Sequence, residues 1–312
     1  MTLDIRIPIS PTPSFFNRTR LLAASIRQFY PDAIVRAYIG CEAHEAAKWQ
    51  VKARWHLPDI HVHFIPQPAF DMWAGTRSPH LATMNARFQN PWPGTHVIIA
   101  DADILCIRPF PELFLEEQAI QGVQAHVAPL SNDDWMRLFR MCSAGYPVFA
   151  HAYSGEGIMG PIGRSAPWYV NSGMVFACRG SFHRICAHYP DVIEIMRRNM
   201  RDTYWFDQLA LAVGAARAGG KKLVLQPRYN FPNQRGFDEA YPDDLADIRF
   251  LHYLRTDTVD RDRDFASLDA MLRLVDRTDL DGSNEVLRQR VEELLPLIQP
   301  EPLTSGEDAP WA

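Results

Sequence analysis

The sequence lacks any run of about 18 apolar residues, the length that a membrane-spanning helix needs. Its first residues, Met-Thr-Leu-Asp-Ile-Arg, also lack the basic-then-apolar pattern of a signal peptide. It has only five cysteines, an odd number, and none of them forms Cys-x-x-Cys; Cys106 and Cys178 lie in apolar, strand-like segments and are expected to be reduced core residues. These absences predict a cytoplasmic protein with no integral membrane span.

The sequence also has no excess of basic residues, since its net charge is −5. Proteins that bind nucleic acid generally have a basic face, so nucleic acid is not an expected partner. A small anionic ligand remains possible, since a metal ion and a few arginines can supply local positive charge.

Several nucleotide-binding and hydrolase motifs are absent, namely the P-loop, H-E-x-x-H and G-x-S-x-G. Residues 155–160 formally match G-x-G-x-x-G, but Pro161 follows them and no acidic residue lies about 20 positions later, as the dinucleotide fingerprint requires. We interpret the Gly-, Ser- and Pro-rich segment 151–167 as a flexible lid instead.

The remaining pattern is that of an ordinary globular α/β protein of 312 residues, with 47% hydrophobic and 22% charged residues. The chain begins β-α-β-α-β, which predicts a parallel sheet covered by helices on both faces. We expect strands at 4–9, 33–39, 60–65, 97–100, 122–128, 168–178, 222–226 and 248–253. Helices are expected at 15–30, 42–55, 79–90, 133–143, 182–200, 203–218, 265–276 and 283–298.

Asp101-Ala102-Asp103 follows the apolar run 97–100, which reads as a strand buried on both faces. Residues i and i+2 along a strand face the same way, which predicts that Asp101 and Asp103 lie side by side, about 6.6 Å apart. Buried carboxylates without partners are costly, and two of them can share a hard cation together with the phosphates that it carries.

Ligands of open α/β sheets bind beyond the carboxyl ends of the strands, where these two aspartates lie. Ser10 and Thr12 follow the first strand at the same edge, and the loop 10–13 is therefore a candidate site for a base or ribose. An ordinary proline-rich loop is the alternative.

The stretch Asp-Ala-Asp-Ile-Leu, followed by a proline-containing turn and Glu-Leu-Phe, resembles GT-A-type glycosyltransferases, especially the glycogenin and lipopolysaccharide glycosyltransferase (family eight-like) group. The resemblance covers about residues 4–254. It implies an α/β, Rossmann-like, mixed but mostly parallel sheet in a domain of residues 1–260. C-terminal helices (261–300) would pack on this domain, and a polar tail (301–312) would follow.

The resemblance also implies an activity, the transfer of a sugar from a nucleoside diphosphate-sugar to a hydroxyl acceptor. A UDP-sugar is the expected donor, and a saccharide, a lipid-linked group or a protein is the expected acceptor. The cofactor would be Mn²⁺ or Mg²⁺, and the motif pattern favours retention of anomeric configuration.

The site residues follow from the same resemblance. The metal ligands would be Asp101, Asp103 and His252, and the catalytic residues would be Asn171, Asp207 and Gln208. Donor-binding residues would be Ser10, Thr12, Arg87, Asp101, Ala102, Ser172, Gly173 and Arg255, the last of these in place of a lysine that the family often has after the histidine.

Two other functions stay open at this point. A nucleotidyltransferase also combines a parallel sheet, carboxylates and a metal, although such enzymes usually have a Gly-rich basic loop after the first strand. A protein that binds a nucleotide-sugar or glycan without turnover is the other alternative. For Asp207, a helix-start residue that complements the helix dipole is the competing interpretation.

Overall fold

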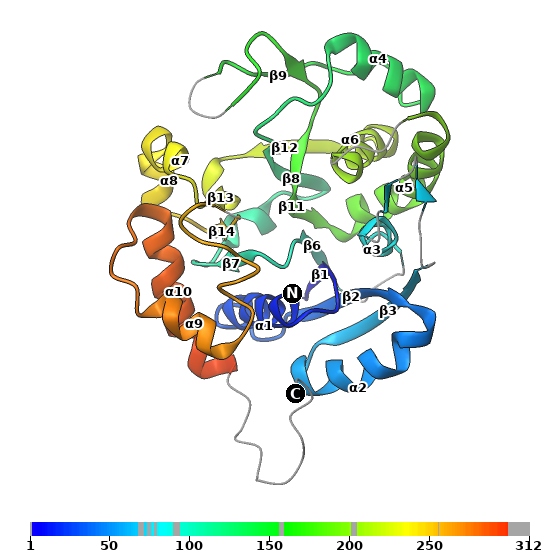
Figure 1. Cartoon of the computed structure of the whole chain (residues 1–312). Coiled ribbons are helices and arrows are strands. Elements are labelled where there is room, and N and C mark those ends of the chain that lie inside the picture. Colours follow the sequence, from blue (N-terminus) through cyan, green and yellow to red (C-terminus); the bar gives the residue numbers. More distant parts are fainter. Residues whose placement is uncertain are drawn as a thin grey trace.

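The computed structural model describes residues 2–67, 72–73, 76–77, 80–89, 94–155, 159–200, 205–254 and 256–298. Its centre is a seven-stranded sheet in the order β12-β8-β11-β6-β1-β2-β3 (Figure 1). These strands are β1 (Leu3–Ile9), β2 (Ile34–Glu42), β3 (His61–Gln67), β6 (His96–Ala100), β8 (Ala119–Gln124), β11 (Val170–Cys178) and β12 (Lys221–Leu225). Only β11 runs antiparallel to its neighbours. The expected α/β class with a mixed, mostly parallel sheet is confirmed.

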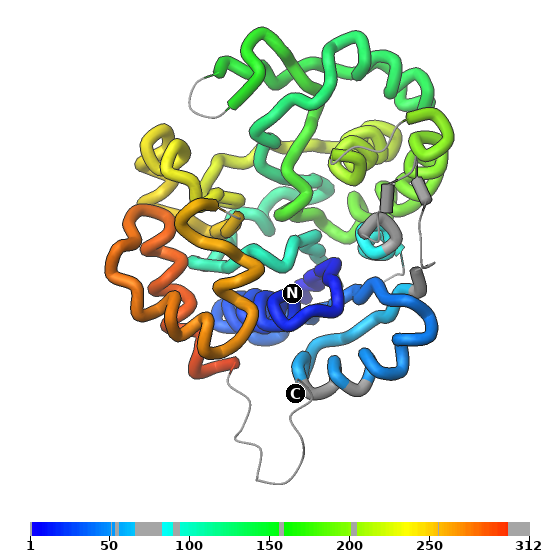
Figure 2. The backbone as a smooth tube through the Cα atoms, viewed as in Figure 1, coloured from blue at the N-terminus to red at the C-terminus, as the bar shows by residue number. Residues whose placement is uncertain are grey.

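Helices cover both faces of this sheet, as the tube in Figure 2 also shows. One face packs against α1 (Pro13–Arg27) and α2 (Ala46–His56), and the other against α4 (Asn132–Met141), α5 (Arg179–Asn199) and α6 (Phe206–Ala218). Successive side chains of the central strand β6 point to opposite faces of the sheet and pack against the helices there. Ile98 faces α1, and Ile99 faces α5 and α6. The sequence showed a continuous apolar run there because both faces of the strand are buried.

A second, smaller sheet lies beside the carboxyl edge of the first, in the order β13-β14-β7. Its strands are β7 (Ile104–Cys106), β13 (Phe231–Pro232) and β14 (Phe250–His252). The chain therefore leaves the large sheet at the end of β6 and enters the small sheet at β7 after the three residues 101–103. This change of sheet turns the Asp-Ala-Asp segment away from the axis of β6.

The last helices, α9 (Leu268–Val275) and α10 (Gly282–Ile298), share an apolar cluster with the small sheet and with Leu21 of α1. The remaining helices are α3 (His80–Ala86), α7 (Arg235–Ala240) and α8 (Pro242–Ala246), with 3₁₀ turns at Ala43–Glu45, Pro111–Leu115 and Pro227–Tyr229. Two short strand pairs complete the structure, β4 (Met72–Trp73) with β5 (Thr76–Arg77) and β9 (His151–Ala152) with β10 (Ser165–Ala166). None of the described helices is long and apolar enough to cross a bilayer.

Some expectations from the sequence are wrong in detail. Asp101 and Asp103 lie in a turn and not on a strand, so the strand spacing does not set their separation. The strand expected at 122–128 is β8, which begins at Ala119 and ends at Gln124. The first and last parts of segment 151–167, the expected lid, pair as β9 and β10, and Tyr153 and Ala166 are buried there; its flexibility stays a prediction. The proposed polar tail, 301–312, lies outside the described residues.

Candidate active site

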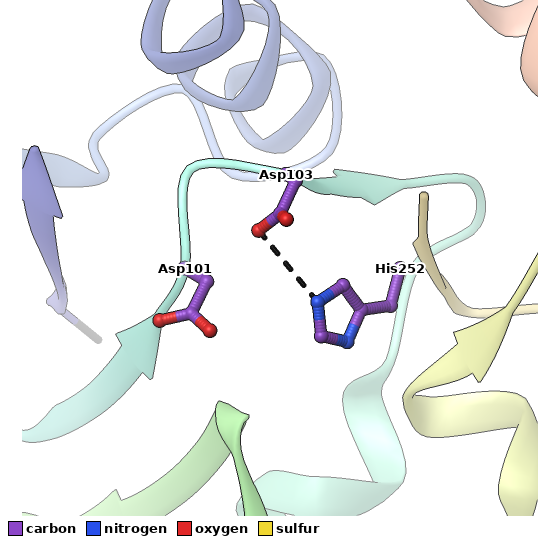
Figure 3. Close-up of side chains that lie close together, drawn as sticks. All are labelled: Asp101, Asp103 and His252. Atoms are coloured by element: carbon purple, nitrogen blue, oxygen red, sulfur yellow. Dashed lines mark ion pairs between the residues drawn. The ribbon is translucent and has the colours of Figure 1, made fainter. Parts of the chain in front are cut away.

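Asp101, Asp103 and His252 converge at the point where the chain passes between the two sheets (Figure 3). One ligand atom of each side chain lies within 4.8 Å of the others, and the Nε2 atom of His252 is 3.6 Å from Oδ1 of Asp103. Asp103 and His252 are buried, whereas Asp101 is partly exposed. The site therefore has a closed inner side and an open outer side.

Backbone pairing sets this geometry. His252 pairs with Ile104 across β14 and β7, which places its side chain beside Asp103. The carbonyl oxygen of Asp103 accepts a hydrogen bond from the Tyr253 amide at 3.0 Å. The Asp101 amide donates to the carbonyl oxygen of Gly173 on β11 at 2.9 Å, so the turn is tied to both sheets.

Gly173 leaves room for the imidazole ring. A Cβ atom at this position would lie 2.7 Å from Cε1 of His252, closer than real Cβ contacts come. Asn171 Oδ1 accepts a hydrogen bond from the Gly173 amide at 2.8 Å, and β11 changes register against β8 between Val170 and Val175. The segment Asn171-Ser-Gly is therefore an irregularity in the strand that makes space for His252.

Burial lowers the pKa of His252 to about 4, against the opposing effect of the Asp101 carboxylate. The ring is therefore neutral near pH 7 and has a lone pair available for a metal ion. Two carboxylates and one imidazole are a donor set that Mn²⁺ accepts, and a separation of 3.6 Å is possible between two ligands of one ion. These residues fit a divalent cation.

Two arginines also face Asp103. Arg261 forms an ion pair with its Oδ2 atom, and Nη1 of Arg18 lies 3.9 Å from the same atom. Burial, together with the neighbouring charge of Arg18, lowers the pKa of Arg261. Cationic side chains thus neutralise one oxygen of this carboxylate already.

A third arginine, Arg87, lies between the carboxylates of Asp101 and Asp207. Its guanidinium lies 3.5 Å from Oδ1 of Asp101 and 3.6 Å from Oδ2 of Asp207. Because Arg87 is fully buried, its charge needs these partners. Ser172 Oγ donates to Oδ2 of Asp207 at 2.8 Å, so the Asp207 carboxylate is held from two sides.

Asp207 and Gln208 lie in the first turn of α6, and Gln208 is buried. Within the described part of the chain, Oε1 of Gln208 has no hydrogen-bond partner, and neither do the buried hydroxyls of Tyr169 and Tyr189. Burial first, and then the charge of Asp207, raise the pKa of both tyrosines. A polar region therefore surrounds Asp207 inside an otherwise apolar core.

The other predicted residues have the following places. Thr12 caps α1 by accepting a hydrogen bond from the Phe15 amide, and Ser10 precedes it at the carboxyl end of β1. Ala102 is buried, and its carbonyl oxygen accepts a hydrogen bond from the Tyr253 hydroxyl. Arg255 lies outside the described residues.

Sequence reasoning missed several charged residues around the site, namely Arg18, Arg261, Asp4 and Arg6. Arg6 is buried, and its Nη2 atom lies 3.5 Å from Oδ2 of Asp4. Its Nη1 atom donates to the backbone carbonyl oxygens of Arg87 and Gln89 at 2.8 and 2.7 Å. It therefore holds the backbone that carries the Arg87 guanidinium. The available signal was the pair of charged residues, Asp4 and Arg6, inside an otherwise apolar strand.

No family model matches the chain, and no curated protein does either. Among solved structures, it is similar to the galactosyltransferase LgtC in complex with donor and acceptor sugar analogues, with 15% identity over 96% of this chain and 98% of that one and a TM-score of 0.49. Mouse xyloside xylosyltransferase 1 in its apo form gives 13% identity over 81% and 97% of the two chains, with a TM-score of 0.45. The bifunctional glycosyltransferase WbbM gives 12% identity over 80% and 45%, with a TM-score of 0.42. All three are named as glycosyltransferases.

Proposed function

We propose that the protein is a metal-dependent glycosyltransferase that moves a sugar from a nucleoside diphosphate-sugar, a UDP-sugar by expectation, to a hydroxyl acceptor. The observation that carries the proposal is the convergence of Asp101, Asp103 and His252 at the carboxyl edge of the sheet. Arg87 links this cluster to Asp207 at the start of α6. A donor that spans this distance would have its diphosphate at the Asp101, Asp103 and His252 cluster and its sugar at Asp207.

The three clustered side chains would hold Mn²⁺ or Mg²⁺. A divalent ion supplies Lewis-acid stabilisation of the charge that develops on a leaving diphosphate. Arg87 adds positive charge at the side of Asp101, and preorganised charge in a largely buried site costs no reorganisation during the reaction. Ser10 and Thr12, after β1 at the same edge, are proposed to contact the base or ribose.

Asp207 and Gln208 are proposed to act on the sugar. Oδ2 of Asp207 already accepts a hydrogen bond from Ser172 and lies beside Arg87, so this oxygen already has two partners. A free general base is what an inverting transfer needs. The unpartnered Oε1 of Gln208 can instead face positive charge that develops on the sugar. This arrangement supports retention of configuration.

A thermal-shift panel tests the proposal. The protein would be titrated with nucleoside mono-, di- and triphosphates and with nucleotide-sugars, in Mn²⁺ and in EDTA. We expect a nucleoside diphosphate and its sugar derivative to raise the Tm in Mn²⁺ and not in EDTA, because only a ligand that binds the folded state shifts it. A rise with triphosphates alone would favour nucleotidyl transfer, and no rise with any nucleotide would contradict the proposal.

A further inference from the structure

The loop between β14 and α9 places Arg261 at the candidate metal site. Two of its residues, Val259 and Phe265, are fully buried, and Phe265 stacks on Tyr253 at a centroid distance of 4.7 Å. Tyr253 in turn binds the backbone of Asp103. The loop is thus packed against the turn that carries the predicted metal ligands.

The turn 260–264 within this loop is tightly hydrogen-bonded. Asp260 Oδ1 accepts from the amides of Asp262 and Arg263 at 2.9 and 3.2 Å, and the Asp260 amide donates to Asp264 Oδ2 at 2.8 Å. Such aspartate-centred turns fix their own backbone. The shape of the turn is therefore set locally.

Helix α1 fixes where the turn lies. Ser14 Oγ donates to the carbonyl oxygen of Arg261 at 2.9 Å, and Asn17 Nδ2 donates to that of Phe265 at 2.9 Å. These two bonds connect residues almost 250 positions apart in the sequence. The backbone of Arg261 is consequently held against α1, and its side chain reaches Asp103.

The carboxylate of Asp103 is divided between two kinds of partner. Its Oδ2 atom faces Arg261, with Arg18 at 3.9 Å, whereas its Oδ1 atom faces His252 at 3.6 Å. A cation can therefore bind Oδ1 together with His252 and Asp101 while Arg261 keeps Oδ2. The ion and the arginine would then share a single negative charge.

The local charges show what this sharing costs the ion. Three arginines (Arg18, Arg87 and Arg261) form ion pairs with four carboxylates (Asp101, Asp103, Asp207 and Asp262), which leaves a net charge of −1. A divalent ion would change this net charge to +1. This excess positive charge disfavours binding of the metal ion alone. The negative charge of a diphosphate that binds with the ion compensates for it.

We propose that Arg261 is a built-in counter-cation of Asp103 that makes the site select a metal–diphosphate complex over the free metal ion. This inference rests on the proposed function. Arg261 repels the free ion and attracts the diphosphate, so it lowers the affinity for the ion alone and raises the affinity for the metal–diphosphate complex. The ratio of these two affinities therefore depends on the charge of Arg261.

The test is calorimetric titration of MnCl₂ into the full chain, alone and in the presence of the nucleoside diphosphate that stabilises the protein most, UDP by expectation. Arg261→Gln removes the charge and keeps a polar side chain, and Arg261→Lys keeps the charge. Arg263→Gln is the matched control, because Arg263 lies in the same turn with a largely exposed side chain paired to Asp264.

We expect Arg261→Gln to bind Mn²⁺ alone about tenfold more tightly than the wild type, as the loss of one nearby like charge in a partly buried site implies. The affinity for the complex of Mn²⁺ and the nucleoside diphosphate should not rise, so the preference for the complex over the free ion should fall by about tenfold or more. Arg261→Lys and Arg263→Gln should both resemble the wild type.

Unchanged or weaker binding of Mn²⁺ alone by Arg261→Gln overturns the inference, because the arginine would then only orient the carboxylate or have no effect. In that case the proposed function stands if the wild type still binds Mn²⁺ together with the nucleotide. A wild type that binds Mn²⁺ neither alone nor with any nucleotide overturns both.

Discussion

Asp207 shows how a single residue can belong to two parts of the site. Its carboxylate accepts a hydrogen bond from Ser172 of β11 and lies beside Arg87, which also contacts Asp101. The carboxylate of Asp101, a predicted metal ligand, and that of Asp207, which is proposed to act on the sugar, thus share the buried guanidinium of Arg87. Removing the charge of Asp207 should change the reaction more than the binding of the donor, because Asp101 still pairs with Arg87.

For Asp207→Asn and Gln208→Ala we expect turnover to fall by roughly 10²-fold or more, as for other positioned polar groups that act in a transition state. The dissociation constant of the donor with Mn²⁺ should change little. Initial rates and calorimetry on the same samples measure the two quantities. Asp191→Asn, at a largely exposed carboxylate of α5, is the control. A parallel loss of affinity and rate would show that the pair holds the donor instead.

His126 predicts an acid-sensitive contribution to stability. Burial, and then the nearby His252, lower its pKa to about 4, while an unfolded histidine titrates near pH 6.5. The unfolded chain therefore binds a proton that the folded chain refuses, and the free energy of unfolding falls as the pH drops from 6.5 towards 4. The slope from one such group is on the order of 1 kcal/mol per pH unit.

His126→Gln should remove this part of the slope. Urea unfolding in EDTA at pH 7.0, 6.0 and 5.0 would measure it for the wild type and the variant, with the exposed His44→Gln as the control. Equal slopes for the wild type and His126→Gln would show that His126 accepts its proton in the folded state as easily as in the unfolded one.

Among the elements, the irregular strand β11 matters most for the site. Asn171 and Gly173 form the point where the strand changes register, and the missing Cβ of Gly173 accommodates the ring of His252. Ser172, between them, binds Asp207. Three consecutive residues thus shape both halves of the site through the backbone as much as through their side chains.

Gly173→Ala tests this role. The added methyl group would lie 2.7 Å from the His252 ring and should displace it. We expect Mn²⁺-dependent nucleotide binding to weaken by at least about tenfold, the loss typical when the support of a metal ligand is disturbed. Gly180→Ala, where the nearest atom is 3.8 Å away, is the control, and both variants should be compared by isothermal titration. Wild-type affinity in Gly173→Ala would exclude His252 as a ligand.

The elements that the sequence predicted well are those with a clear apolar pattern. The buried run before Asp101 was identified as a strand because both of its faces are covered. The turn 101–103 was misread because the change from the large sheet to the small one depends on the pairing of β7 with β14, some 145 residues away in sequence. Local periodicity carries no information about such pairing.

Across the whole molecule, the cation partners of the site come from distant parts of the chain. Arg18 lies on α1, Arg87 follows α3, and Arg261 belongs to the turn before α9. Arg87 was predicted only through the family resemblance, and the other two have no motif around them. Their roles arise when α1 packs against both the small sheet and the C-terminal segment. Only the folded structure shows that three arginines surround the predicted metal ligands.

In the proposed function, the cluster of Asp101, Asp103 and His252 supports metal-dependent sugar transfer. The most direct measurement is the rate at which nucleoside diphosphate is released from a panel of nucleotide-sugars, in Mn²⁺ and in EDTA, for the wild type and Asp103→Asn. We expect release from at least one donor in Mn²⁺, none above background in EDTA, and a loss of roughly 10²-fold or more in a folded Asp103→Asn protein. Equal release in Mn²⁺ and EDTA, or a wild-type rate in Asp103→Asn, would contradict it.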